Sequence, residues 1–233
     1  MRTPNTFTIA RWAVLLYALI MGYLVTPTLR AQQTHLDYLL NYTATNFHYG
    51  DQQEQFKGFR KPVWGVQAGL AFQAGITPAL SLQSEFYFMM KGGALKANNP
   101  LGAAATKTRL FSLELPLLAR IHLGRFYANA GPSMAYNLAG RIKTEGQEGL
   151  PDQVNSRVFS GTEASFRRWE VGLQLGMGYE LPLRQSRIAF DLRYQHGLSN
   201  LSRNAEVYNR NWVFNILISA PWGHNPLAAT SRS

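Results

Sequence analysis

The sequence contains no cysteine and carries unusually few charged side chains. The absence of cysteine excludes a disulfide framework and any thiolate metal site. Charged residues make up 15% of the 233 residues, whereas soluble domains usually carry about 25%. Hydrophobic residues make up 46%, so the class of the protein must be read from how these apolar residues are spaced.

Recognised metal and cofactor motifs are also missing. The five histidines are scattered along the chain without HxxxH or HExxH spacing. The acidic residues between positions 145 and 163 do not follow a calcium-loop pattern, and the glycine-containing segment 92–107 is not a phosphate loop. The sequence therefore predicts neither a metal nor a cofactor.

No catalytic motif stands out either. A nucleophile, base and acid could be chosen from Ser112 or Ser133, His122 and Asp191. Almost any chain of this length offers such a trio, and the spacing of these residues matches no known motif. We predict a protein that is not an enzyme, with a membrane-embedded enzyme as an alternative.

Basic residues outnumber acidic ones, which gives a formal charge of +10. The basic residues are distributed over several segments between apolar stretches and do not form one concentrated face with stacking aromatics. Such a face is what nucleic-acid binding requires. The composition therefore predicts no nucleic-acid partner.

The N-terminus has the organisation of an export signal. Arg2 and Arg11 precede an uncharged apolar run at 12–25, and the small residue Ala31 follows at a plausible cleavage point. This run of 14 residues is shorter than the ~20 that a spanning helix needs. We predict a signal peptide at 1–31, with an N-terminal membrane anchor as the alternative reading.

After the signal, apolar and polar residues alternate in segment after segment. From Trp169 to Leu181 every second residue is apolar, with Glu170 and Gln174 among the residues between. A period of two indicates a strand with one apolar and one polar face. Eight segments follow this pattern, the first of them least regularly: 35–44, 63–76, 80–90, 111–123, 126–138, 167–183, 187–195 and 211–219.

The connections between these segments alternate between long and short. Long connections lie at 50–61, 92–107, 141–165 and 199–210, and short ones at 77–79, 124–125 and 182–186. This alternation places all long loops at one end, as in outer-membrane barrels with tight periplasmic turns. The prediction is an all-β fold, an eight-stranded antiparallel up-and-down transmembrane β-barrel at 32–222, followed by a flexible C-terminal tail at 223–233.

Tryptophans mark the ends of several strands. Trp64, Trp169 and Trp212 each open a strand that runs from the long-loop end, and each lies on the apolar face, while Trp222 follows the last strand. Aromatic girdles occupy the interfaces of membrane barrels. We therefore predict that these four residues form a girdle, that the apolar faces meet lipid, and that both termini are periplasmic.

The opposite faces would then line the lumen. An eight-stranded barrel is just wide enough to be filled by side chains, and an isolated buried charge would be prohibitive. We predict that the inward charges pair with one another and plug the lumen, with a small conducting channel as the alternative. The predicted lumen network consists of Glu85, Glu114, Arg120, His122, Arg168, Glu170, Asp191 and Arg193.

Several segments resemble the PorT-like outer-membrane β-barrel family of the Bacteroidetes. The resemblance runs from about residue 59 to 222, and its carriers include "LELPLLAR", "NAGPSMAY" and "RYQHGL". It implies an integral outer-membrane barrel of a Gram-negative bacterium. Because a known member of that family is implicated in the type IX secretion and gliding apparatus, it also implies a possible secretion role.

The long loops are the expected functional surface because they are basic and the lumen is expected to be closed. Lysine and arginine suit the phosphates of lipopolysaccharide, and an envelope protein is the other partner considered. We predict a structural, adhesion or secretion-assembly component of the outer membrane. A soluble periplasmic ligand-binding barrel, with Leu173 and Phe190 lining its lumen, is a further alternative.

Overall fold

The computed structural model of the protein describes residues 34–77, 79–100, 102–146, 151–156, 158–159, 166–183, 186–203 and 205–219. Three of the sequence predictions lie outside these residues, namely the signal peptide at 1–31, the girdle position of Trp222 and the C-terminal tail at 223–233.

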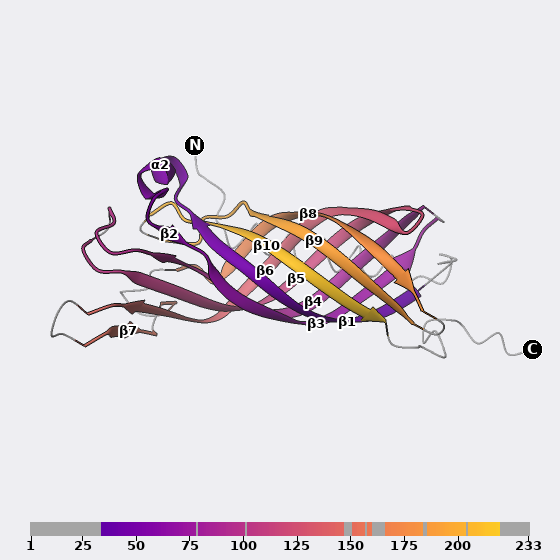
Figure 1. The fold of residues 1–233 in the computed structure, drawn as a ribbon, viewed down its shortest axis with the longest axis horizontal. Coiled ribbons are helices and arrows are strands. Elements are labelled where there is room, and N and C mark those ends of the chain that lie inside the picture. Colours follow the sequence, from indigo (N-terminus) through magenta and orange to yellow (C-terminus); the bar gives the residue numbers. More distant parts are fainter. Residues whose placement is uncertain are drawn as a thin grey trace, which may run out of the picture.

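Eight long strands form the wall of a barrel (Figure 1). In chain order they are β1 (Thr34–His48), β3 (Val63–Gly75), β4 (Leu80–Leu95), β5 (Thr106–Leu123), β6 (Phe126–Thr144), β8 (Trp169–Pro182), β9 (Arg187–Gly197) and β10 (Tyr208–Ser219). Each is antiparallel to its neighbours in the sequence, and β1 pairs with β10 to close the ring. The predicted eight-stranded antiparallel up-and-down barrel is confirmed.

Two short helices and two short strands lie at one end of this barrel. The segment between β1 and β3 holds a 3-10 helix, η1 (Gly50–Gln52), a helix α2 (Gln53–Phe56) and a strand β2 (Arg60–Lys61), which pairs with β4. A further strand, β7 (Gln153–Asn155), pairs with the end of β6. Within the residues that the structure describes, no helix has the length and apolar character needed to cross a membrane.

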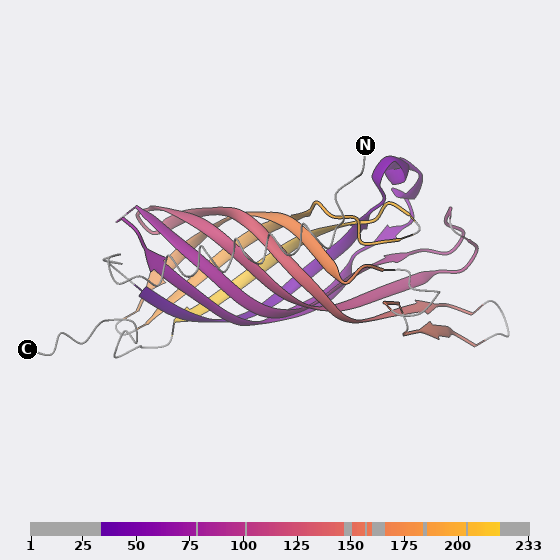
Figure 2. The ribbon, with the colours of Figure 1, turned by 180° about the vertical axis from the view of Figure 1, so that it is seen from behind.

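The long and short connections separate as the sequence predicts. Figures 1 and 2 show α2, β2 and β7 at one end of the barrel, which we call the long-loop end. The connections β3–β4, β5–β6 and β8–β9 lie at the opposite, short-turn end, where β1 begins and β10 finishes. Because the chain crosses the length of the barrel eight times, an even number, the first residue of β1 and the last residue of β10 lie at the same, short-turn end.

The burial pattern is the reverse of that of a soluble barrel. On β8, Leu173, Leu175 and Met177 are 48%, 63% and 69% exposed, whereas Glu170 and Gln174 are buried. Large apolar side chains on the outside need a non-aqueous surrounding, which a lipid bilayer provides. Leu173 and Phe190 therefore line the outer surface, contrary to the alternative of a soluble barrel with a lipophilic lumen.

Strands β4, β5 and β6 continue further than the alternating pattern alone predicts. They have 16, 18 and 19 residues, whereas about 9–11 residues suffice to cross a bilayer in a barrel. The surplus projects beyond the barrel at the long-loop end (Figure 2). A register shift between Phe111 and Ser112 on β5 makes Leu138 an extra residue on β6 and changes which later β6 residues face outward.

The long-loop end has its own apolar cluster, which we call the loop cluster. Its buried members come from strand ends and several loops: Phe47, Tyr49, Phe56, Leu95, Leu110, Val158, Phe159, Phe166, Leu201 and Val207. The rings of Tyr49 and Phe56 stack with centroids 4.2 Å apart, and burial raises the pKa of Tyr49 to about 12. Described residues of several long loops thus pack together with strand ends at this end of the barrel.

Candidate functional site

The lumen near the long-loop end is organised around one buried lysine. Lys91, on β4, is fully buried, and its ammonium lies 2.6 Å from Glu114 on β5 and 2.6 Å from Glu170 on β8. Tyr87 and Gln195 donate further hydrogen bonds to the Glu114 carboxylate. The lysine group, Lys91 with Glu114 and Glu170, thus joins three strands across the lumen.

A second group occupies the middle of the lumen. The Arg193 guanidinium contacts Glu85 at 2.8 Å and Asp191 at 3.0 Å. Asn129 and Tyr127 donate hydrogen bonds of 2.7 and 3.1 Å to Oδ2 of Asp191, the same oxygen that Arg193 contacts. We call Arg193, Glu85 and Asp191 the arginine group. Its carboxylates are satisfied by both a cation and neutral donors, as buried charges require.

A third group lies toward the short turns. Arg120 and Arg187 both contact Glu180, at 3.2 and 3.1 Å, and Arg187 also reaches Asp37 at 2.8 Å. The Arg120 guanidinium lies 3.8 Å above the centre of the Tyr127 ring and 3.8 Å from Asp191, which connects this turn-end group to the arginine group. The ionic contacts therefore continue along the lumen toward the short turns.

Room for these long side chains comes from glycines on a neighbouring strand. Gly176 and Gly178 of β8 pair with Arg193 and Asp191 of β9. A Cβ at Gly178 would lie 2.2 Å from the Tyr127 ring, and one at Gly176 would lie 2.9 Å from the Arg193 side chain. The glycines therefore permit Tyr127 and Arg193 to fill the lumen.

The structure brings six of the eight sequence-predicted lumen residues into these ion pairs, and two lie elsewhere. His122 is half-buried near the short turns, where hydrogen bonds join it to Ser81 and Gln73. Arg168 is partly exposed at the start of β8, donates to the carbonyls of Asn137 and Leu138, and makes no ion pair within the described residues. Arg168 precedes the paired part of β8, so the strand does not hold it over the lumen.

Sequence reasoning missed four charged members of the lumen: Lys91, Asp37, Glu180 and Arg187. The signal for Lys91 was available, because it continues the inward alternation of Glu85, Tyr87 and Met89 on β4. Asp37 belongs to the polar face of the irregular first segment. Glu180 lies on the polar face of the alternation from Trp169 to Leu181, and Arg187 begins the segment 187–195, but the predicted network included neither.

The outer surface carries paired aromatic residues. Trp64, Trp169 and Trp212 are 54%, 39% and 55% exposed. Each lies beside a tyrosine of a neighbouring strand, with ring centroids 5.1 Å apart for Tyr42–Trp64, 4.9 Å for Tyr136–Trp169 and 5.0 Å for Tyr194–Trp212. Trp64 and Trp212 are both opposite Ala44 of β1, so they share one row of the wall.

The residues considered for catalysis are not assembled into a triad. Ser112 donates to Glu114 and to the Met89 carbonyl, while Asp191 binds Arg193 and its neighbours. The hydrogen bonds of His122 lead to Ser81 and Gln73 instead. In the described part of the chain, no three His, Asp or Glu side chains gather as metal ligands would.

Comparison with known proteins identifies the family. The family model for the outer membrane protein beta-barrel domain matches residues 31–203. A search of curated proteins found no match.

Solved structures similar to this chain include three bacterial proteins. Ail, the attachment invasion locus protein of Yersinia pestis, crystallised with the heparin analogue sucrose octasulfate, is 10% identical, with 81% of this chain and 99% of that chain covered and a TM-score of 0.40. Neisserial surface protein A is 10% identical, with 82% of this chain and 99% of that chain covered and a TM-score of 0.43. OprG from Pseudomonas aeruginosa is 11% identical, with 80% of this chain and 95% of that chain covered and a TM-score of 0.34.

The match of the family model extends over most of the chain, from before β1 to beyond β9. The closed strand ring and its apolar outer face agree with that match. The protein therefore belongs to the outer membrane protein β-barrel domain family and is an integral barrel of the outer membrane.

Proposed function

We propose that this protein is a non-enzymatic outer-membrane barrel with a sealed lumen, which acts through its long loops as an adhesion or assembly component. The observation that carries this proposal is the chain of ion pairs from the lysine group to the turn-end group. The loop cluster adds an apolar layer across the long-loop end. With the interior filled, the loops are the surface left to meet a partner.

In this proposal the long loops face the cell exterior, and the short turns and both termini face the periplasm. The aromatic pairs around Trp64, Trp169 and Trp212 support a girdle at the outer interface. Long outer loops and tight periplasmic turns are the usual arrangement of such barrels. The resemblance to PorT-like proteins favours attachment to a secretion apparatus among the possible assembly roles.

Orientation can be tested with single cysteines because the natural chain has none. Lys57→Cys places a thiol beside α2 at the long-loop end, and Arg125→Cys places one in the turn between β5 and β6. A membrane-impermeant maleimide should label the first variant on intact cells and the second only after the outer membrane is opened. The reverse labelling pattern would overturn the proposed orientation.

Closure of the lumen is tested by planar-bilayer recording of the purified full-length protein. We expect no stable conductance steps from samples whose unheated form migrates as a folded barrel. Heat-denatured protein is the matched control for detergent leakage. Reproducible steps that disappear on heating would contradict the sealed lumen.

A small channel is the second candidate, and one observation favours it. Several buried amide atoms of the lumen have no hydrogen-bond partner among the residues that the structure describes, among them Nδ2 of Asn41, Oε1 of Gln67 and Oδ1 of Asn215. Buried polar atoms of this kind are commonly satisfied by water. Conductance in the recording above would make this candidate the leading one.

A further inference from the structure

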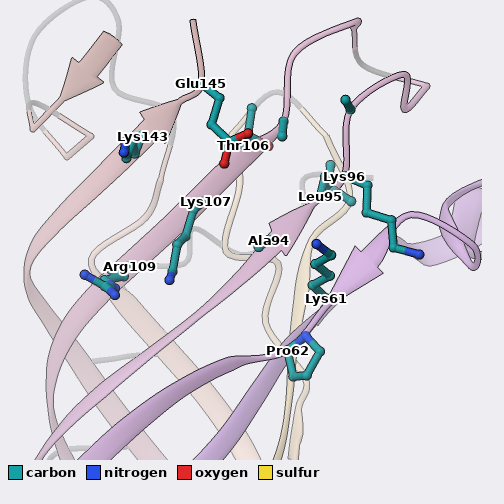
Figure 3. A pocket seen from close by; sticks show the side chains of 12 residues that line it. Lys61, Pro62, Ala94, Leu95, Lys96, Thr106, Lys107, Arg109, Lys143 and Glu145 are labelled. Atoms are coloured by element: carbon teal, nitrogen blue, oxygen red, sulfur yellow. The ribbon is translucent and has the colours of Figure 1, made fainter. Parts of the chain in front are cut away.

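A basic hollow lies on the outward side of the wall at the long-loop end (Figure 3). Its volume is about 570 Å³, and its charged lining consists of Lys61, Lys96, Lys107, Arg109, Lys143 and Glu145. Figure 3 shows these side chains around Ala94, whose small side chain leaves the space between them open. Five cations thus share the hollow with one carboxylate.

Strand register places the cations side by side. Lys61 of β2 is opposite Ala94 of β4, which is opposite Lys107 of β5, and Lys107 is opposite Lys143 of β6. Residues directly opposite each other in a sheet point to the same face. One row of the extended wall therefore presents three lysines outward, with Arg109 in the next outward row.

The hollow lies at the height where the lipid-facing surface ends. On β5, Arg109 and Lys107 continue the outward alternation of Phe111, Leu113 and Leu115. From Phe111 to the end of β5 there are enough residues to span the bilayer core, for which about 9–11 are required. The cations therefore begin one step beyond the apolar belt, at the level of lipid headgroups, and they face sideways.

The positive charge of this site is incompletely balanced by the protein. Lys107 is directly opposite Lys143, and Arg109 is directly opposite Arg141, although like charges in such positions are destabilising. Lys143 is paired with Asp152 at 2.5 Å. Nε of Arg109, in contrast, is buried and has no hydrogen-bond partner within the described part of the chain. An anion in the hollow would relieve the repulsion and provide a missing acceptor.

We propose that this hollow binds a phosphate group of lipopolysaccharide in the outer leaflet. Guanidinium and ammonium groups recognise phosphate through charge-assisted hydrogen bonds. A soluble polyanion would approach from above the loops, whereas this site opens toward the headgroup layer beside the barrel. The inference rests on the orientation in the proposed function, which the cysteine labelling tests separately.

The test compares binding of fluorescent lipopolysaccharide to the full-length barrel in phosphatidylcholine nanodiscs. Lys107→Gln combined with Arg109→Gln should weaken binding roughly tenfold to thirtyfold, since each cation near an anionic headgroup contributes on the order of 1 kcal/mol. The matched control, Lys57→Gln combined with Arg203→Gln, removes the same charge from loops outside the hollow. It should change binding less than twofold.

Three further measurements test the ligand chemistry and provide for a variant that does not fold. Lipopolysaccharide stripped of its phosphates should bind the wild type and the hollow variant equally weakly, and Lys107→Arg should retain binding. The single variant Lys107→Gln, at an exposed position, provides the readout if the double variant does not fold. Equal losses in the hollow and control variants, or a preference for soluble heparin over lipopolysaccharide, would overturn the proposal.

Discussion

The lumen and the loop cluster are both buried, yet they differ in composition. Beside a small apolar cluster that includes Leu39, Met89 and Leu217, the lumen is filled mainly by charged and amide side chains. The lumen holds Lys91, Arg120 and Arg193 among carboxylates and amides, with little or no exposed surface. The loop cluster, which covers the end of the same barrel, is almost entirely apolar. One chain therefore builds a mainly polar core in the lumen and a conventional hydrophobic core at the long-loop end.

The difference follows from what surrounds each region. Within the wall, alternation assigns most large apolar residues to lipid, so polar residues fill most of the lumen. Beyond the wall, the surroundings are aqueous, and the loops are ordered by burying apolar side chains in the usual way. The lumen should therefore depend on specific partners, whereas the loop cluster should tolerate any change that preserves volume.

The largest effect is expected from the lysine group. Lys91→Met leaves Glu114 and Glu170 buried without their cation. Removing one partner of a buried pair costs about 3–5 kcal/mol. Urea unfolding in phospholipid vesicles, followed by heat-modifiable gel migration, should report a loss of this size in the free energy of unfolding.

A compensated variant sharpens this test. Lys91→Met with Glu114→Gln and Glu170→Gln removes the cation and both negative charges together, so it should recover most of the lost stability. If the single and triple variants were equally destabilised, packing volume and not charge pairing would hold the lysine group together.

The next effect concerns the outer surface of the wall. Leu173→Arg places a charge on the lipid-facing side of β8, which costs about 2–4 kcal/mol near the bilayer midplane. We expect poor membrane assembly, measured as the folded fraction in the outer membrane. Leu198→Arg, just beyond β9 at the long-loop end, should assemble normally. Normal assembly of the Leu173 variant would contradict the outward orientation of this face.

A smaller effect on the barrel is expected from the loop cluster. Phe56 is 1% exposed and stacks on Tyr49, so Phe56→Ala should open the cluster locally while the barrel stays folded. Limited proteolysis should cleave the segment between β1 and β3 faster, with little change in barrel unfolding. Phe56→Leu, which retains most of the volume, should remain protected. Equal loss of barrel stability in Phe56→Ala and Lys91→Met would remove the distinction between the two regions.

The smallest effect concerns the exposed pair that joins β6 to the loop preceding β7. A hydrogen bond from Lys143, together with one from the Gly146 backbone N–H, holds the pKa of Asp152 below its usual value. The stabilisation that the ionised Asp152 carboxylate gives this loop is therefore complete above the ordinary aspartate pKa. It is lost as the pH falls through the lowered pKa. The protection of the Gly146 amide from hydrogen exchange, taken relative to the intrinsic exchange rate at each pH, should fall only under acid conditions in the wild type. Asp152→Ala, which removes the acceptor, should show low protection at every pH.

Alternation, loop lengths and tryptophan positions were sufficient to predict the barrel. The inward placement of Glu85, Glu114 and Arg193 followed from the same period. The pattern could not predict which inward charges would meet, because pairing depends on strand tilt and register across the lumen. Arg187 and Asp37, for example, are 150 positions apart in the chain but 2.8 Å apart in the lumen.

The loop cluster was missed for a related reason. Several of its residues, among them Phe56, Val158 and Leu201, are isolated apolar side chains in polar loops, and no local period marks them as a core. Only the folding of several loops over one barrel end brings Phe56, Val158 and Leu201 together.

The order of apolar and polar residues by itself determined the eight wall strands and the two faces of each strand across the membrane. A period of two leaves no other regular structure in which every apolar side chain shares one face. The tertiary structure decided which cations share the basic hollow. On β6 the extra residue at Leu138 turns Arg141 and Lys143 to the outward face beside Arg109 and Lys107. A bulge shifts the alternation by one residue, and only the pairing of β6 with β5 determines where that shift occurs.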